Sequence, residues 1–188
     1  MIGFEPQGDD IFDILPDEVK DTTVTETKGV LTIVRVDPEK VVRLIRVLQE
    51  NGVNKIRYRG GEIRKLDPEL ARRFAQAARD ILEYSIEELD RLDIPLTTAS
   101  NWGSTTTGLV TPKSDVEVLL GVPSTYDLET AGQLLRHDTD FQNRLWELST
   151  PVRIPSITFS LTVPSIYEQH PEEKYIPIAH DTVTLKHP

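Results

Sequence analysis

Two acidic side chains, Asp115 and Glu117, stand two residues apart at the head of an apolar run. The run alternates as a β-strand does, so Val116, Val118 and Leu120 would share one face and the two acids the other. Two carboxylates on one face of an otherwise apolar strand are costly to bury unless a cation neutralises them. Hard divalent ions such as magnesium suit such a pair together with phosphate oxygens. The spacing therefore predicts a cation site.

A turn rich in glycine and threonine lies just before this strand. Gly103 and Ser104 open the turn and Gly108 closes it. Backbone N–H groups and a hydroxyl in such a turn can hold a phosphate. Lys113 follows the turn and would either counter phosphate charge or extend into solvent as an ordinary loop lysine. We expect Trp102 to pack beneath the turn, with stacking on a nucleotide base as the alternative.

The stretch from Gly103 to Glu117 resembles the signature of the DNA polymerase β-like nucleotidyltransferase superfamily. That signature reads Gly-Ser, three residues, Gly, a short link, and then Ser-Asp-x-Asp or Ser-Asp-x-Glu. Gly108-Leu109, Pro112 and Ser114-Asp115 are also similar to the motif of minimal nucleotidyltransferases and non-canonical poly(A) polymerases. The chain departs from the commonest pattern at position 117, where Glu replaces Asp.

The resemblance implies a transferase that uses two magnesium ions. It would move a nucleoside monophosphate from a nucleoside triphosphate to a hydroxyl on RNA, protein or a small molecule, and release pyrophosphate. Asp115 and Glu117 would hold the ions, and a third carboxylate on a later strand would complete the site; Asp181 is the candidate, with a solvent-facing aspartate at a strand end as the alternative. The residues implied to hold the nucleotide are Gly103, Ser104, Gly108 and Lys113.

Two other functions fit the same residues. The longer Glu117 and the uncertain third acid also suit a protein that keeps the nucleotidyltransferase fold and binds a nucleotide or a partner without catalysis. The remaining alternative is a structural or assembly protein with no nucleotide site, because glycine, serine and threonine are ordinary turn residues.

Composition narrows the class of protein. The chain has 188 residues, of which 38% are hydrophobic and 28% charged, as in globular proteins. No apolar run approaches the ~20 residues of a membrane span. The chain has no Cys, which excludes disulfides, thiolate catalysis and cysteine zinc sites. The N-terminal residues lack the pattern of a signal peptide, so we expect a cytoplasmic protein.

Charge argues against broad binding of nucleic acid. The net charge is −10, whereas sequence-independent binding depends on cations that displace counterions from phosphates. Basic residues nevertheless crowd one region, which predicts a solvated hairpin and helix surface or, alternatively, a local basic patch. These residues are Lys55, Arg57, Arg59, Arg64, Lys65, Arg72 and Arg73.

Hydrophobic periodicity predicts an α/β (α+β) protein with a mixed sheet. We expect an acidic, loosely docked arm over residues 1–28, which could contact a partner protein, a small β-α-β-β unit over 29–66, and a nucleotidyltransferase-like domain over 67–188. Asp37-Pro38 and Asp67-Pro68 each have the form of a helix start. The expected elements are strands at 30–36, 56–59, 62–66, 94–100, 115–120, 152–163 and 175–186, and helices at 38–50, 67–92 and 127–148.

Overall fold

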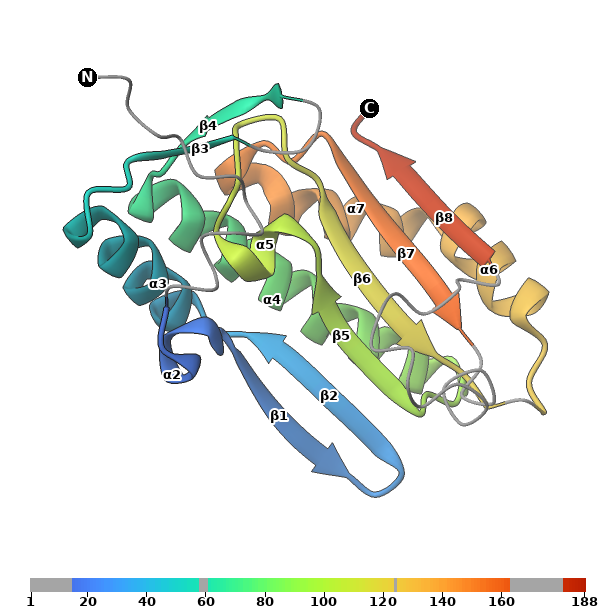
Figure 1. The fold of residues 1–188 in the computed structure, drawn as a ribbon. Coiled ribbons are helices and arrows are strands. Elements are labelled where there is room, and N and C mark those ends of the chain that lie inside the picture. Colours follow the sequence, from blue (N-terminus) through green and yellow to red (C-terminus); the bar gives the residue numbers. More distant parts are fainter. Residues whose placement is uncertain (1–14, 58–60, 124, 163–180) are drawn as a thin grey trace.

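The computed structural model describes residues 15–57, 61–123, 125–162 and 181–188. Its centre is a six-stranded sheet (Figure 1). In spatial order the strands are β1 (Thr23–Lys28), β2 (Leu31–Val36), β5 (Thr98–Trp102), β6 (Val116–Gly121), β7 (Ser156–Thr162) and β8 (Asp181–Lys186). A second, two-stranded sheet joins β3 (Lys55–Arg57) to β4 (Ile63–Lys65).

The large sheet is mixed, which confirms the expected fold class. β1 runs antiparallel to β2, β5 to β6 and β7 to β8, whereas β2 runs parallel to β5 and β6 parallel to β7. Each parallel pair is joined through helices, as parallel strands require. β5, β6 and β7 are therefore central strands, and β6 carries Glu117 at its start.

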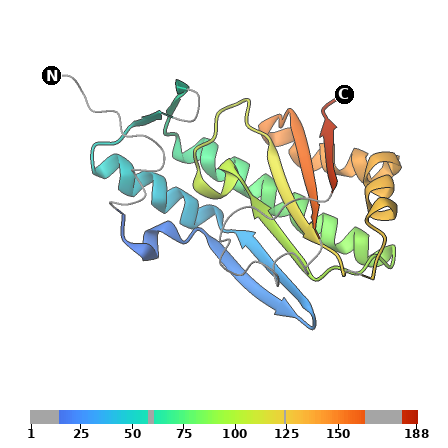
Figure 2. The same ribbon diagram turned by 45° about the vertical axis from the view of Figure 1, so that its right-hand side comes forward.

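Helices cover one face of this sheet. Figures 1 and 2 show α3, α4 and α7 on the same side of it, with α6 beside β8. We call that side the helix face and the opposite side the outer face. The helices are α2 (Asp17–Lys20), α3 (Pro38–Glu50), α4 (Pro68–Arg91), α5 (Ser104–Thr107), α6 (Leu128–His137) and α7 (Thr139–Ser149), followed by the 3-10 turn η2 (Thr150–Val152).

Both Asp-Pro helix starts are confirmed. The carboxylate of Asp37 accepts hydrogen bonds from the backbone N–H groups of the first turn of α3, and Asp67 does the same for α4. The proline that follows each cap lacks an N–H and has a backbone angle already suited to a helix. These two local signals fix the starts of the longest helices, and α4 then spans 24 residues behind the sheet.

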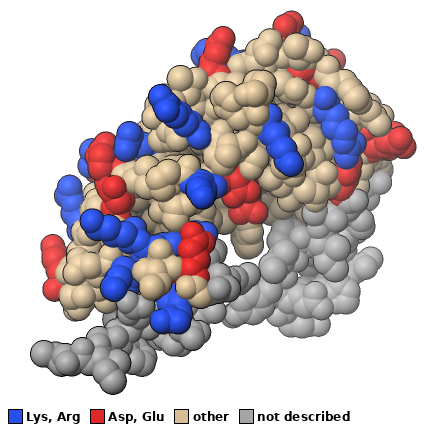
Figure 3. Space-filling view, turned by 90° about the horizontal axis from the view of Figure 1, so that it is seen from above, with Lys and Arg blue, Asp and Glu red and all other residues tan. Residues whose placement is uncertain are grey.

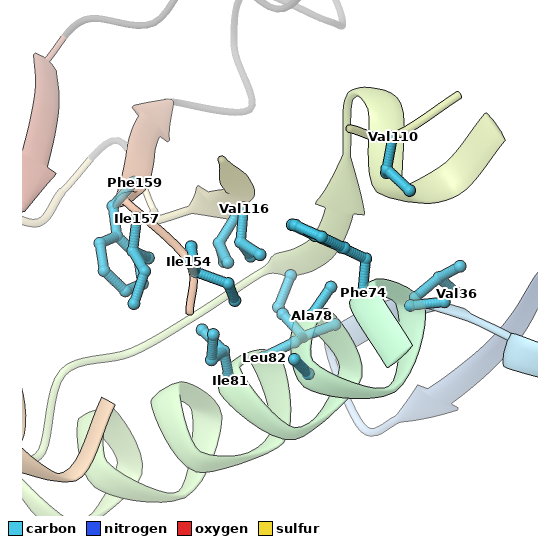
Figure 4. Packing of buried hydrophobic residues seen from close by; sticks show 14 of the residues in the cluster. Val36, Phe74, Ala78, Ile81, Leu82, Val110, Val116, Ile154, Ile157 and Phe159 are labelled. Atoms are coloured by element: carbon cyan, nitrogen blue, oxygen red, sulfur yellow. The ribbon is translucent and has the colours of Figure 1, made fainter. Parts of the chain in front are cut away.

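The core lies between the helix face and α4. Apolar side chains of the strands pack there against Phe74, Ile81 and Leu82 of α4 (Figure 4). Phe159 of β7 lies 5.9 Å, centroid to centroid, from Phe141 of α7. Within the described residues the buried apolar side chains form a continuous cluster, and residues of the 29–66 segment belong to it.

The structure differs from our expectations for the acidic arm over residues 1–28 and for the small unit over 29–66. The loosely docked arm is wrong for residues 15–28, because Leu15 and Val19 are buried and β1 pairs with β2 along its whole length. Residues 1–14 lie outside the described residues. The 29–66 segment is divided, since β2 joins the large sheet whereas β3 and β4 form the small one.

The single helix expected over 127–148 is wrong, because the structure has two helices there. α6 ends at His137, and the side chain of the next residue, Asp138, accepts a hydrogen bond from the N–H of Phe141 and so caps α7. An aspartate at a helix start satisfies backbone donors that a continuous helix would use internally. The break turns α6 toward β8, which it contacts.

The surface carries cations and anions close together. On the face seen in Figure 3, Lys and Arg side chains alternate with Asp and Glu. Two of the crowded basic residues lie beside acids, with Arg72 3.3 Å from Glu39 and Arg64 3.3 Å from Glu62. This mixture favours the solvated surface that we expected for Arg72, whereas Arg64 is largely buried and donates a hydrogen bond of 2.6 Å to the carbonyl of Leu109. No helix within the described residues has the length and apolar character needed to cross a membrane.

Candidate functional site

The turn between β5 and α5 places a glycine where the chain bends sharply. Gly103 has φ 75° and ψ −154°, a conformation essentially restricted to glycine. The three threonines that follow donate their hydroxyl protons to carbonyls three residues earlier, at 2.7–3.1 Å. These hydroxyls therefore stabilise the turn itself. Within the described chain, the structure shows no comparable bond for the hydroxyl of Ser104.

Asn101 fixes the end of β5 from the helix face. Its side-chain oxygen accepts a hydrogen bond of 2.9 Å from the N–H of Val36, and its side-chain nitrogen donates one of 2.8 Å to the carbonyl of Ala78. Because Asn101 points toward the helices, its neighbour Trp102 points to the outer face. The strand end that leads into Gly103 is thus tied to both β2 and α4.

Strand β6 brings Glu117 against this turn. Val116, Val118 and Leu120 are buried on the helix face, and Glu117 alternates with them, so it lies on the outer face. The strand register places Glu117 directly opposite Trp102. A Cβ atom built on Gly103 would lie 1.8 Å from Oε2 of Glu117. Glycine at position 103 therefore leaves the space that the carboxylate occupies.

The electrostatics at this corner are unfavourable without a ligand. Burial raises the pKa of Glu117, and the negative charge of Asp115 raises it further. Nowhere in the described ranges does a cation or a hydrogen-bond donor pair with either carboxylate. The pair fits one divalent cation, since a positive charge would relieve both causes of the raised pKa. A further hard ligand, such as a phosphate oxygen, would complete its coordination.

The structure does not bring Asp181 to this corner, which corrects our assignment of it. Asp181 is in phase with the buried Val183 and Leu185, so it lies on the helix face, opposite to Glu117. It pairs with Leu161 at the far end of β7, and its carboxylate binds the guanidinium of Arg136 at 2.7 Å. The three predicted carboxylates therefore do not converge.

The position beside Glu117 on the neighbouring strand β7 carries a hydroxyl and not a carboxylate. Thr158 of β7 lies in register beside Glu117, and its hydroxyl is 3.2 Å from that of Thr184 on β8. Among the residues that the structure describes, no group of three or more His, Asp and Glu side chains could hold a metal ion. Within the described residues, Asp115 and Glu117 are therefore the only acids that the structure places at this corner.

The other motif residues have structural contacts. Gly108 has a positive φ of 74°, and a Cβ atom there would lie 2.9 Å from side-chain atoms of Val41 and Ile45 in α3. Ser114 is buried, and its hydroxyl accepts a hydrogen bond of 2.8 Å from the N–H of Thr111. Lys113, which immediately precedes Ser114, is exposed. The motif therefore shapes the loop that delivers Asp115 to the sheet.

Our expectation that Trp102 packs beneath the turn is wrong. Its side chain lies on the outer face and the residue is 44% exposed. It is one of the few large apolar residues of the described chain that are exposed, and it is the one beside the acid pair. The strand alternation carries this information, since Ala99 and Asn101 are the buried positions of β5.

Comparison of the chain with protein-family models, with curated proteins and with solved structures found no match.

Proposed function

We propose that this protein binds a nucleoside triphosphate with one divalent cation at the corner formed by Gly103, Ser104, Asp115 and Glu117, and that it does not transfer the nucleotide. The observation that carries the proposal is the acid pair on the outer face, which has a raised pKa at Glu117 and no cation partner within the described chain. A charge arrangement that is costly alone becomes favourable when a cation binds.

The nucleotide is supported by the resemblance of residues 103–117 to the nucleotidyltransferase signature. The turn and the acid pair are adjacent, because the carboxylate of Glu117 lies against Gly103. In this proposal Asp115 and Glu117 hold the cation, and the hydroxyl and N–H of Ser104 donate hydrogen bonds to phosphate oxygens. Magnesium is the expected ion, because it is commonly held by one or two carboxylates and the phosphates of its substrate.

The lack of transfer is supported by the neighbouring strand. The two-ion reaction needs a third carboxylate to hold the ion that activates the acceptor hydroxyl. Thr158 stands beside Glu117 instead, and a neutral hydroxyl is a much weaker ligand for a second cation. Asp181 already has Arg136 as its partner on the other face. Within the described chain, the residues proposed to bind the triphosphate are thus not joined by a third carboxylate.

A nucleotidyltransferase that acts on RNA, protein or a small molecule is the second candidate. The same acid pair favours it. Its third carboxylate would have to come from outside the described residues, where the segment 163–180 contains Glu168, Glu172 and Glu173. The two functions differ in one product, because only the transferase releases pyrophosphate from the triphosphate.

Calorimetric titration with ATP, with and without magnesium, tests the binding. We expect binding that requires magnesium and falls by roughly 30-fold or more in Asp115→Asn and in Glu117→Gln, because each substitution removes a charged ligand of the cation. Asp181→Asn is the matched control and should bind as the wild type does. Magnesium-independent binding, or equal affinity in all these proteins, would contradict the proposal.

Incubation with ATP labelled at the α-phosphate separates the two candidates. We expect no labelled product and no pyrophosphate release above background, with RNA, with casein or with the protein alone as acceptor. Pyrophosphate release that requires magnesium and disappears in Asp115→Asn would favour the transferase instead.

A further inference from the structure

Trp102 is an exposed tryptophan beside the acid pair. The residue is 44% exposed, although a tryptophan side chain has a large apolar area that folding normally removes from water. The other exposed large apolar residues of the described chain are Val24, Val30 and Ile63, which lie on β1, on the β1–β2 connection and on β4. Trp102 alone of these four adjoins the acid pair.

The register fixes how near the indole is to the carboxylates. Trp102 on β5 and Glu117 on β6 are directly opposite each other. Side chains at such positions share a face, with Cβ atoms about 4.5–5.5 Å apart. The next residue after Trp102 is Gly103, against which the carboxylate of Glu117 lies. The aromatic ring, the acid pair and the turn therefore meet at one place on the outer face.

The backbone under Trp102 is rigid. Asn101 anchors the strand to β2 and α4 through two hydrogen bonds. The hydroxyl of Thr105 donates a hydrogen bond of 3.1 Å to the carbonyl of Trp102. Trp146, by contrast, packs 5.1 Å, centroid to centroid, from the ring of His187. Within the described chain the structure shows no such ring partner for Trp102. An exposed aromatic ring on an anchored strand, without a ring partner in the described chain, suits stacking on a flat ligand.

We propose that Trp102 is the platform on which the base of the bound nucleotide stacks. This inference rests on the proposed function, since the acid pair and the turn hold the triphosphate of the same molecule. Bases stack well on aromatic side chains because every base has a π-face. The ligand is therefore a nucleoside triphosphate and not an inorganic polyphosphate.

Stacking also predicts the selectivity. It depends weakly on which base is present, because no hydrogen-bond pattern is read. ATP, GTP, CTP and UTP should bind within roughly tenfold of one another, and each more tightly than tripolyphosphate, which has the same phosphates without a base.

Magnesium titrations with ATP and with tripolyphosphate, on matched variants of the full chain, test the platform. Trp102→Ala should lower the affinity for ATP by roughly 5- to 100-fold and leave the affinity for tripolyphosphate unchanged, because base–aromatic stacking contributes this range. Trp102→Phe should retain most of the ATP affinity. Glu117→Gln should weaken both ligands, because it acts on the cation.

Fluorescence gives a measurement that leaves Trp102 itself unchanged. In Trp146→Phe, the emission comes from Trp102 alone, because the chain has two tryptophans. We expect ATP to quench this emission in the presence of magnesium, with the same midpoint as calorimetry, and tripolyphosphate to leave it nearly unchanged.

The possible outcomes are distinct. Equal affinity for ATP and tripolyphosphate, with no effect of Trp102→Ala on either, would overturn the platform while leaving the triphosphate site intact. Binding of neither ligand by the wild type would overturn both proposals. An ATP affinity that falls in Trp102→Ala together with that for tripolyphosphate would also overturn the platform, because the ring would then act on the fold of the corner.

Discussion

Acidic residues on the two faces of the large sheet differ in whether they have a cationic partner. On the helix face, Asp181 lies in phase with buried apolar residues and binds Arg136 at 2.7 Å. On the outer face, Glu117 has no such partner in the described part of the chain, and burial and Asp115 raise its pKa. An acid that serves the fold has its counter-charge built in. The acid without one is the residue that we expect to receive a counter-charge from a ligand.

The same contrast applies to aromatic residues. Phe159 on the helix face is fully buried between apolar neighbours, whereas Trp102 on the outer face is 44% exposed. Side chains at adjacent positions of one strand point to opposite faces, so single substitutions can alter one face and leave the other unchanged. The predictions below use such pairs, and they are ordered from the largest expected effect to the smallest.

Phe159→Ala should cause the largest loss of stability. Removing this buried ring is expected to lower the free energy of unfolding by about 3–5 kcal/mol, through lost burial and a cavity. Thr158→Ala, one residue earlier on the outer face, should lower it by only about 1 kcal/mol, through the lost contact with the hydroxyl of Thr184 and a lower strand propensity. Urea denaturation followed by circular dichroism measures both. A similar loss in the two variants would show that the faces do not differ as described.

Gly103→Ala should act on both the fold and the ligand. The backbone conformation of Gly103 strains any other residue, and the new Cβ would collide with the carboxylate of Glu117, so we expect a loss of about 3 kcal/mol in unfolding free energy. ATP binding should also be lost, because the carboxylate must move. Both effects can be measured by denaturation and calorimetry.

Gly29→Ala is the control for Gly103→Ala. Gly29 also has a positive φ, of 61°, but nothing lies within 4 Å of a Cβ built there. We expect a cost of about 1 kcal/mol, from backbone strain alone, and no change in ATP affinity. Equal effects of the two substitutions would remove the steric argument for Gly103.

Asp181→Asn should have an intermediate effect. It breaks a pair in which both side chains are about one-third exposed, so we expect a loss of about 1 kcal/mol in the free energy of unfolding. Arg136→Gln should cost a similar amount, and the double variant should be less destabilised than the sum of the two. A strictly additive double-mutant cycle would contradict the pairing.

Glu117→Gln should change stability least, and in the opposite direction. The pKa of Glu117 is higher in the folded state than in the unfolded chain. As the pH rises, the unfolded chain therefore loses this proton first. Between the two pKa values the folded state becomes less stable relative to the unfolded chain. The glutamine variant lacks this loss. We expect its melting temperature to equal or exceed that of the wild type at neutral pH without ligand.

A pH series checks the sign of this effect. The difference in melting temperature between Glu117→Gln and the wild type should grow as the pH rises above the ordinary glutamate value toward neutrality. A difference that shrinks over this range would mean that the carboxylate is stabilised in the folded state, as a partnered acid would be.

Much of the fold follows from local patterns in the sequence. Asp67-Pro68 predicted the start of α4 because the cap and the proline act within one turn. The alternation after Asp115 predicted β6 with Glu117 on the face opposite the buried Val116 and Val118. The break at Asp138 was missed because an aspartate is compatible with a helix interior and with a cap, and packing of α6 near β8 decides between them.

The candidate site was less predictable, although part of the missing information was present. Asp181 is in phase with Val183 and Leu185, whereas Glu117 is out of phase with Val116 and Val118. That phase difference already indicates opposite faces, if both strands bury the same side. The register that places Thr158 beside Glu117 depends on pairing of distant segments, which periodicity within one strand does not encode.

The most direct test of the account is the melting temperature of the wild type, Glu117→Gln and Asp181→Asn with and without magnesium and ATP. A ligand at about one hundred times its Kd stabilises the folded state by about 2.7 kcal/mol. We predict that magnesium and ATP raise the melting temperature of the wild type and of Asp181→Asn by an amount that corresponds to this stabilisation. They should raise that of Glu117→Gln little or not at all. An equal rise in all three proteins, or none in the wild type, would contradict the claim that the unpaired acids of the outer face hold a cation and a triphosphate.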